Sequence, residues 1–232
     1  MQDTQTYIGF AKEVLQATFS DINLLITAFT HRSYVNEHRS SVSEHNERLE
    51  FLGDAVLELV VTEFLYRGHK DPEGVLTNWR SALVRTESIS AAAAKDNFEP
   101  LLRLSRGEKR GSDRARAQIL ANTYEAVIGA LYLDQGYDAA KQFISSSLLP
   151  SFQTILANGT WMDAKSHLQE LVQSKDGYTP VYKVLSDEGP DHDKLFTVGV
   201  FVNGDQKGQG SGPSKQIGQQ QAAEAALIHY QS

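Results

Sequence analysis

The spacing of apolar residues changes at Ala157–Asp163, a short polar stretch that contains one glycine. Before it, apolar residues recur at helical intervals. After it, every second residue of Phe196–Val202 is Phe or Val, a pattern typical of a half-buried strand. Gly-Pro and Asn-Gly pairs add turn signals in the same region. We therefore predict an all-α domain at 1–157, a linker at 158–162 and a small α+β domain at 163–232.

The helical pattern predicts several helices in the first domain. They are expected near Gly9–Ala17, Asn23–Phe29, His45–Tyr66, Asp71–Lys95, Arg114–Leu133 and Tyr137–Leu156. Asp71 is a possible cap, Pro72 is expected at the first helical position, and Gly136 is a plausible stop. In the second domain, helices over Ala164–Ser174 and Ser214–Tyr230 flank the strands and give the order α-β-β-β-α.

Composition narrows the classes of protein. The 232 residues include no cysteine, which excludes disulfides and thiolate metal sites and suits a reducing cytoplasm. Apolar runs stay below the roughly 18 residues that a membrane span needs, so no membrane partner is expected. The net charge of −7 argues weakly against a nucleic-acid partner, although the charge of the contacting face decides such binding.

The expected helix His45–Tyr66 is mostly apolar but carries four acidic residues on one stripe. These are Glu47, Glu50, Asp54 and Glu58, at positions i, i+3, i+7 and i+11. Buried carboxylates are costly unless they are compensated, and carboxylates at this spacing repel one another. The stripe is either a solvated face or part of a cation site.

A second apolar helix carries Asn122 and Glu125 at i, i+3. If the two helices pack, oxygen ligands from both converge. Such ligands suit Mg²⁺ or Mn²⁺, which are hard cations. A divalent cation site is therefore one interpretation. A solvated face is the commoner one for an acidic stripe, although the apolar surroundings on nearly every other side argue against it.

The stripe lies within "NERLEFLGDAVL" (Asn46–Leu57), which resembles the signature of the ribonuclease III family of double-stranded-RNA endonucleases. Further similar stretches follow in family order: Ala28–Tyr34, Glu73–Val84, Leu104–Tyr137 and the C-terminal domain. The resemblance covers nearly the whole chain. It implies an all-α endonuclease domain followed by a double-stranded RNA-binding domain.

The resemblance also implies roles for single residues. Glu50, Asp54 and Glu125 match the metal-site carboxylates, with Asp54 and Glu125 as catalytic residues. Glu47 matches a residue at the margin of the site that supports metal or substrate binding. Phe51 matches an aromatic residue of the family's dimer interface, although it also fits an ordinary core position.

Asn122 departs from the family pattern, which usually has Asp at this position. An amide offers a neutral oxygen and cannot act as a base. By resemblance it is still expected to bind the metal. Two functions follow: an active, Mg²⁺-dependent endonuclease in which Mn²⁺ can substitute, or a dimeric RNA-binding protein with weakened or lost cleavage. For the active enzyme, the family implies a homodimer, 5′-phosphate and 3′-hydroxyl products, precursor RNA processing and a cytoplasmic location.

RNA contacts are expected in both domains. The segment 103–116 has six basic and two acidic residues, a net charge of +4, and directly precedes the helix of Asn122. Arg106, Lys109 and Arg110 in this segment are predicted to attract phosphates, unless it is only a solvated loop.

The segment Trp161–Ser232 resembles a double-stranded RNA-binding domain. Within it, Gln169, His192 and Lys215 match RNA-contacting positions. If these residues do not contact RNA, Gln169 is simply part of an exposed helix face and His192 is a turn residue. The segment has six lysines, no arginine and nine acidic residues, a net charge of −3, so we expect weak RNA binding with a shallow salt dependence.

Overall fold

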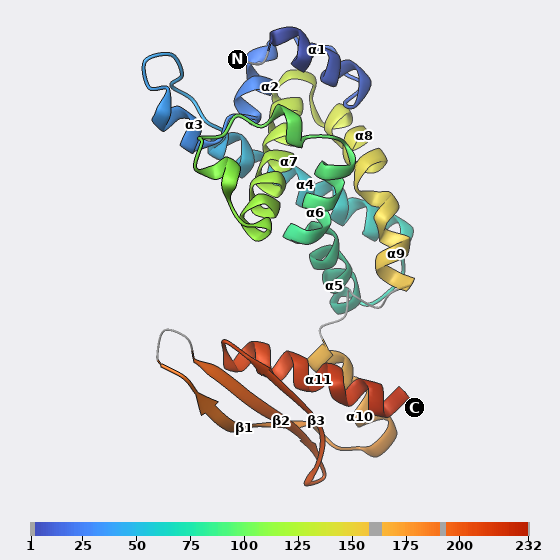
Figure 1. Cartoon of the computed structure of the whole chain (residues 1–232). Coiled ribbons are helices and arrows are strands. Elements are labelled where there is room, and N and C mark those ends of the chain that lie inside the picture. Colours follow the sequence, from blue (N-terminus) through green and yellow to red (C-terminus); the bar gives the residue numbers. More distant parts are fainter. Residues whose placement is uncertain (1–2, 158–163, 191–193, 232) are drawn as a thin grey trace. The chain divides into compact units, whose positions relative to one another are not determined.

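Nine α-helices and three short 3-10 helices make up the first part of the chain (Figure 1) among the residues that the structure, a computed structural model, describes: 3–157, 164–190 and 194–231. The α-helices are α1 (Thr4–Glu13), α2 (Ile22–Ala28), α3 (Arg32–Glu37), α4 (Glu47–Gly68), α5 (Glu73–Val84), α6 (Thr86–Lys95), α7 (Asp113–Gln135), α8 (Tyr137–Ser147) and α9 (Phe152–Ala157). The 3-10 helices are η1 (Glu99–Leu101), η2 (Glu108–Arg110) and η3 (Leu149–Ser151).

The chain forms two compact units, Met1–Gly159 and Thr160–Ser232. The predicted linker 158–162 lies outside the described residues. As expected, the first unit is helical and the second combines helices with strands. Among the described residues, no helix has the length and apolar character needed to cross a membrane.

Most predicted helices are confirmed, with corrections to their bounds. The helix expected near Gly9–Ala17 is α1, Thr4–Glu13. The single helix expected at Asp71–Lys95 is broken at Arg85, whose extended backbone separates α5 from α6. At this break, the Ser88 hydroxyl donates a hydrogen bond of 2.7 Å to the Ala82 carbonyl oxygen. Pro72 is the N-cap residue that precedes α5, and not its first helical residue as predicted. The short helix α3 was not predicted, because six residues are too few to show a helical period.

Helix α7 is the centre of the first unit, and most of its residues from Ile119 to Leu131 are buried. The Ser112 hydroxyl accepts a hydrogen bond from the backbone of Ala115 at its start. Gly136 ends it with a φ of 84°, which an L side chain rarely adopts, so the predicted stop is confirmed. Figure 1 shows α4 lying alongside α7.

Two helical glycines allow α4 and α7 to approach closely. A Cβ atom on Gly53 would lie 1.7 Å from the backbone oxygen of Glu125. A Cβ atom on Gly129 would lie 2.2 Å from the backbone oxygen of Leu49. Any side chain at either position would therefore separate the helices, and the two glycines fix the distance at which their polar residues meet.

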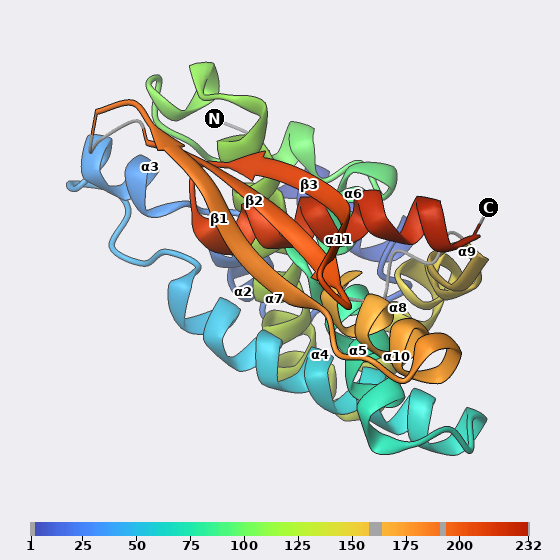
Figure 2. The ribbon, with the colours of Figure 1, turned by 90° about the horizontal axis from the view of Figure 1, so that it is seen from below.

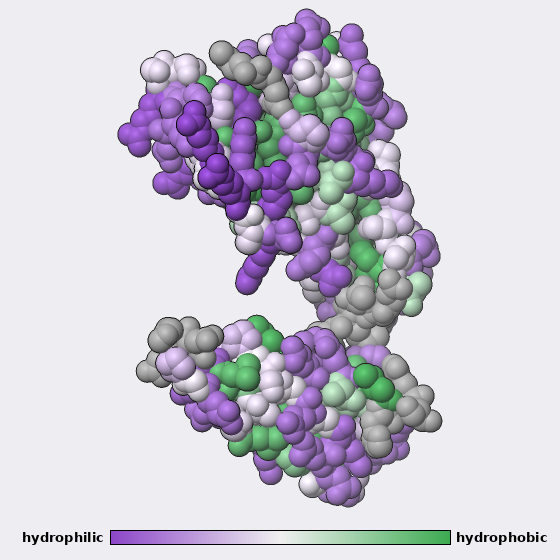
Figure 3. Space-filling model, in the orientation of Figure 1, coloured by the Kyte–Doolittle hydropathy of each residue, from purple (hydrophilic) through white to green (hydrophobic). Residues whose placement is uncertain are grey.

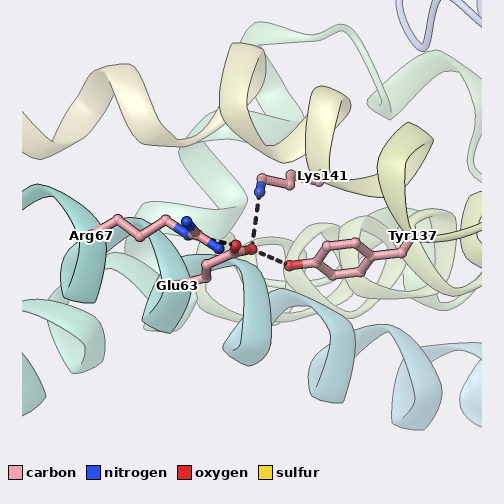
Figure 4. A network of polar contacts seen from close by, with 4 residues as sticks. All are labelled: Glu63, Arg67, Tyr137 and Lys141. Carbon is pink, nitrogen blue, oxygen red and sulfur yellow. Dashed lines mark hydrogen bonds and ion pairs between the residues drawn. The ribbon is translucent and has the colours of Figure 1, made fainter.

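A polar network ties α4 to α8 (Figure 4). The Glu63 carboxylate accepts hydrogen bonds from Tyr137 Oη at 2.7 Å and from Lys141 Nζ at 2.9 Å. Arg67 Nε donates to it at 2.7 Å. Because hydrogen bonds from Tyr137, Lys141 and Arg67 stabilise the ionised form, the pKa of Glu63 is lowered to about 2.

The second unit contains α10 (Ala164–Asp176), β1 (Val181–Glu188), β2 (Leu195–Val202), β3 (Asp205–Gly212) and α11 (Lys215–Gln231). The strands form an antiparallel sheet in the order β1-β2-β3. Figure 2 shows α10 and α11 on one face of this sheet.

The core of the second unit lies between sheet and helices. Val200 and Val202 of the alternating strand are buried there against Leu168 and Ala226. The order α-β-β-β-α and the small α+β fold are as predicted.

Candidate active site

The polar residues predicted for the cation site lie on α4 and α7, the two helices that the glycine contacts hold together. Glu50 and Asp54 are one helical turn apart on α4, and Asn122 and Glu125 are neighbours on α7. Asp54 is exposed, whereas Glu50, Asn122 and Glu125 are half-buried. The cluster is thus open to solvent on one side.

The carboxylates of the cluster act on one another. Burial raises the pKa of Glu125 to about 8, and the charges of Asp54 and Glu50 act in the same direction. Burial also raises the pKa of Glu50, with further raising effects from Glu47 and Asp54 and a lowering effect from a hydrogen bond with Asn122. The two helices therefore bring negative charge together at a cost in free energy.

A divalent cation fits this donor set. Half-buried carboxylate oxygens are the ligands that Mg²⁺ and Mn²⁺ prefer, and a cation would offset the repulsion that acts on Glu125. Among the described residues, no three His, Cys, Asp or Glu side chains already stand in a metal-coordinating arrangement. Glu50, Asp54 and Glu125 would therefore have to change their side-chain positions to bind an ion together.

The Asn122 side chain has its own partner on α7. Its Oδ1 accepts a hydrogen bond of 2.7 Å from Gln118 Nε2, one turn earlier. Its side chain also forms the hydrogen bond that favours ionised Glu50. Asn122 is thus part of the cluster as a hydrogen-bonding group.

The two remaining acids of the stripe lie at its ends. Glu47 is exposed: its Oε1 is 3.6 Å from Arg32 Nη1, and its Oε2 is 3.8 Å from His45 Nδ1. Glu58 pairs with Arg80 at 3.2 Å, from Oε2 to Nε. Glu58 therefore has a structural partner on α5, whereas Glu47 influences the cluster through Glu50.

The basic segment before α7 divides into exposed and engaged residues. Arg106, Lys109 and Arg110 are exposed, as predicted for phosphate contacts. Arg103 instead lies 4.5 Å from the centroid of the Tyr34 ring. Figure 3 shows strongly hydrophilic side chains gathered on the face that includes this segment.

Two basic residues of this segment interact with other residues of the same domain. Arg103 Nη1 donates to Thr30 Oγ1 at 3.0 Å. Arg116 forms an ion pair with Glu99. The number of basic side chains in this segment that are available to phosphates is therefore smaller than the six counted in the sequence.

In the second unit, the predicted RNA-contacting residues are divided between the two helices. Gln169 is exposed on α10, and Lys215 is exposed at the start of α11. Lys215 and Lys194 each have Nζ 5.8 Å from the Phe196 ring centroid, so they form a small basic group that includes a lysine not predicted as a contact. His192 lies outside the described residues.

Phe51 projects from α4 with 82% of its surface exposed. The alternative that it is an ordinary core residue is therefore wrong for the single chain. Leu133, on α7, is also exposed, and both residues line the same depression of about 840 Å³. An apolar surface of this kind is typical of a protein–protein contact.

Sequence reasoning missed three residues that shape the site. Gly53 and Gly129 lie inside helices, where glycine is destabilising. A glycine at such a position therefore indicates that another backbone packs closely against it. Gln118 precedes Asn122 by four residues, a spacing at which amide side chains form hydrogen bonds on a helix. Each signal is visible in the sequence.

Two family models match the chain. Residues 21–152 match the model described as Ribonuclease-III-like, and residues 164–230 match the Double-stranded RNA binding motif. Together with the helical fold and its carboxylate cluster, these matches define the class: the protein is an endoribonuclease with a double-stranded RNA-binding domain.

Individual relatives agree with this class. The chain is 46% identical over 217 residues to Ribonuclease 3 of Enterococcus faecalis, covering 93% of this chain and 94% of the relative. It is 43% identical to Ribonuclease 3 of Streptococcus pneumoniae, covering 98% and 97%. A solved nuclease domain of ribonuclease III from Campylobacter jejuni is 38% identical, with a TM-score of 0.56, and covers 63% of this chain and 99% of that one. The chain belongs to the ribonuclease III family.

Proposed function

We propose that the protein hydrolyses double-stranded RNA with the help of Mg²⁺, for which Mn²⁺ can substitute. The observation that carries this proposal is the cluster of Glu50, Asp54 and Glu125, in which burial and mutual repulsion raise the pKa of Glu125 to about 8. Carboxylates whose pKa is raised in this way are typical of sites that bind a ligand or catalyse a reaction. Family membership supplies the substrate class.

The residues divide the work of hydrolysis. Glu50, Asp54 and Glu125 would hold the cation, which would lower the pKa of water and stabilise charge on the phosphate. Arg106 and Lys109 attract the RNA backbone towards the cluster. A water molecule loses a proton as its oxygen bonds to phosphorus. The bond from phosphorus to the 3′-oxygen breaks and the 3′-oxygen takes up a proton, which leaves a 5′-phosphate and a 3′-hydroxyl.

We also propose a homodimer with one site per subunit, each cutting one strand. The exposed side chains of Phe51 and Leu133, which line one depression, support this assembly. The Campylobacter jejuni nuclease domain is described as structurally flexible in a region involved in its dimer formation, which supports the same assembly here. We further propose that the enzyme acts in the cytoplasm on ribosomal and other RNA precursors.

The second unit is proposed to hold the duplex by its shape and phosphates. Exposed Gln169 and Lys215 support this role, and His192 stays a prediction. With a net charge of −3 for Trp161–Ser232, we expect a shallow dependence of log K on log salt. A slope as steep as that of a strongly basic homologous domain would contradict this expectation.

A non-cleaving RNA-binding protein is the second candidate, because Asn122 removes one negative charge from the usual set. The test incubates the full chain with a long RNA duplex in Mg²⁺, Mn²⁺ or EDTA, and follows both cleavage and gel shift. Cleavage in either cation but not in EDTA is expected. Shift without cleavage in both cations would favour the second candidate, and a large rate gain in Asn122→Asp would then locate the defect.

A further inference from the structure

Helix α3 contacts the backbone of the basic segment 103–116 at two consecutive residues. The backbone nitrogen of Ser105 donates a hydrogen bond of 3.1 Å to Ser33 Oγ. The backbone nitrogen of Arg106 donates to the Glu37 carboxylate and lies 3.3 Å from each of its oxygens. Ser33 and Glu37 are one helical turn apart on α3. One face of α3 therefore holds two neighbouring peptide groups of a stretch that lies outside the α-helices.

The contact at Ser105 reaches residues that carry positive charge. Ser105 is buried, and its Oγ accepts a hydrogen bond of 3.2 Å from the backbone nitrogen of Glu108. Its carbonyl oxygen accepts from the backbone nitrogen of Lys109, also at 3.2 Å. These bonds fix the start of η2, which includes Lys109 and Arg110. The position of Ser105 therefore limits where these two basic side chains lie.

His31 orients the hydroxyl of Ser33. Its Nδ1 accepts a hydrogen bond of 3.2 Å from the backbone nitrogen of Ser33 and lies 2.7 Å from Ser33 Oγ. Because Nδ1 is an acceptor, the hydroxyl donates its proton to it and keeps a lone pair for Ser105. Burial lowers the pKa of His31, which favours the neutral ring that this arrangement requires. The backbone nitrogen of His31 also donates to the Arg103 carbonyl oxygen at 3.1 Å.

The charge of Glu37 on its own would oppose RNA binding, because a carboxylate repels phosphates. Its contact with the peptide group of Arg106 gives it a different role. A hydrogen bond to an ionised acceptor is stronger than one to a neutral acceptor. Ser33 in turn satisfies the backbone nitrogen of buried Ser105, which would be costly to leave without a partner.

We propose that Ser33 and Glu37 are positioning residues for RNA binding by the first unit. By holding two consecutive peptide groups, they fix the path of the basic segment. They thereby set the places at which Arg106, Lys109 and Arg110 meet the phosphates of a duplex. This inference rests on the proposed contacts between the basic segment and RNA, and it adds two side chains that act through that segment.

A double-mutant cycle tests the role of Ser33. Full-length proteins bind a labelled RNA duplex in EDTA, where cleavage is not expected, and fluorescence anisotropy reports the Kd. Ser33→Ala removes one hydrogen bond and should weaken binding about fivefold. In a background where Arg106, Lys109 and Arg110 are all glutamine, the same change should weaken binding less than about twofold. Ser40→Ala, at an exposed serine after α3, is the control and should leave the Kd unchanged.

A matched pair of variants tests the role of Glu37. Glu37→Gln and Glu37→Ala both remove the negative charge, but only glutamine keeps an oxygen that accepts from the backbone nitrogen of Arg106. Glu37→Ala should therefore bind the duplex about threefold more weakly than Glu37→Gln. If the charge of Glu37 only repels RNA, both variants bind equally and more tightly than the wild type. That result would overturn the role of Glu37.

Equal losses from Ser33→Ala in the two backgrounds, or no loss in either, would overturn the role of Ser33. Thermal melts followed by circular dichroism confirm that each variant is folded at the temperature of the assay. If Ser33→Ala does not fold, the two Glu37 variants decide the inference. A wild type that shows the expected differences in Kd but cleaves nothing in Mg²⁺ or Mn²⁺ would refute the proposed cleavage and keep this inference. A wild type that cleaves but shows none of the differences would refute this inference alone.

Discussion

Replacing Glu125 with Gln should stabilise the protein in the absence of metal, even though it should abolish cleavage. The pKa of Glu125 is raised from 4.5 to about 8. Between these values the folded chain retains a proton that the unfolded chain has released. The penalty on folding therefore begins as pH rises above about 4.5 and is complete above about 8.

The size of the penalty follows from the shift. At about 1.36 kcal/mol per pK unit, the full difference amounts to about 5 kcal/mol. Glu125 is only half-buried, so solvent screening reduces this upper bound to about 2 kcal/mol. Glu125→Gln should thus gain about 2 kcal/mol more at pH 8.5 than at pH 5.

Urea unfolding followed by circular dichroism tests this expectation in EDTA at both pH values and one protein concentration. Adding Mg²⁺ at pH 8.5 should stabilise the wild type more than Glu125→Gln, because the ion binds only the folded cluster. Glu58→Gln is the matched control: it removes a carboxylate from the same α4 stripe, but one that pairs with Arg80. The control should show no gain at pH 8.5. The same pH dependence in wild type and Glu125→Gln would refute the electrostatic argument.

Three further variants test other parts of the structure. Gly129→Ala should separate α4 from α7, lower the melting temperature by several degrees and reduce cleavage at least about tenfold. The control Gly9→Ala, whose Cβ meets no atom within 4 Å, should leave cleavage unchanged and should not lower the melting temperature, because alanine favours helix α1 more than glycine does. Phe51→Asp should shift the protein from dimer to monomer in light scattering, and an unchanged dimer would exclude this surface. Glu63→Gln should lower the melting temperature at pH 7, and because the pKa of Glu63 is about 2, this difference should vanish as pH falls towards 2.

The helical content and the domain order were predictable because apolar periodicity reports directly on which face of a helix or strand is buried. His45–Tyr66 and Arg114–Leu133 correspond to α4 and α7 within a few residues. The break at Arg85 was not predictable. It arises from tertiary packing and a hydrogen bond from Ser88, and neither the local composition nor the spacing marks it.

That the carboxylates of the site would lie near one another was predictable, but the contacts around them were not. Spacing placed Glu50 and Asp54 on one face of one helix and paired Glu125 with Asn122 on a second helix. The resemblance then matched the three carboxylates to a metal site. The hydrogen bond from Gln118 to Asn122, and the lowering effect of Asn122 on the pKa of Glu50 on another helix, were not predicted. Contacts of this kind between helices appear only in three dimensions.

The most direct measurement is a single-turnover cleavage assay of a defined RNA duplex with saturating full-length protein. Wild type and Glu125→Gln are compared in Mg²⁺, and duplex binding is measured for both. The account predicts cleavage by the wild type to 5′-phosphate and 3′-hydroxyl ends, and tight binding without cleavage by Glu125→Gln. Undiminished cleavage by Glu125→Gln, or cleavage by the wild type in EDTA, would contradict it.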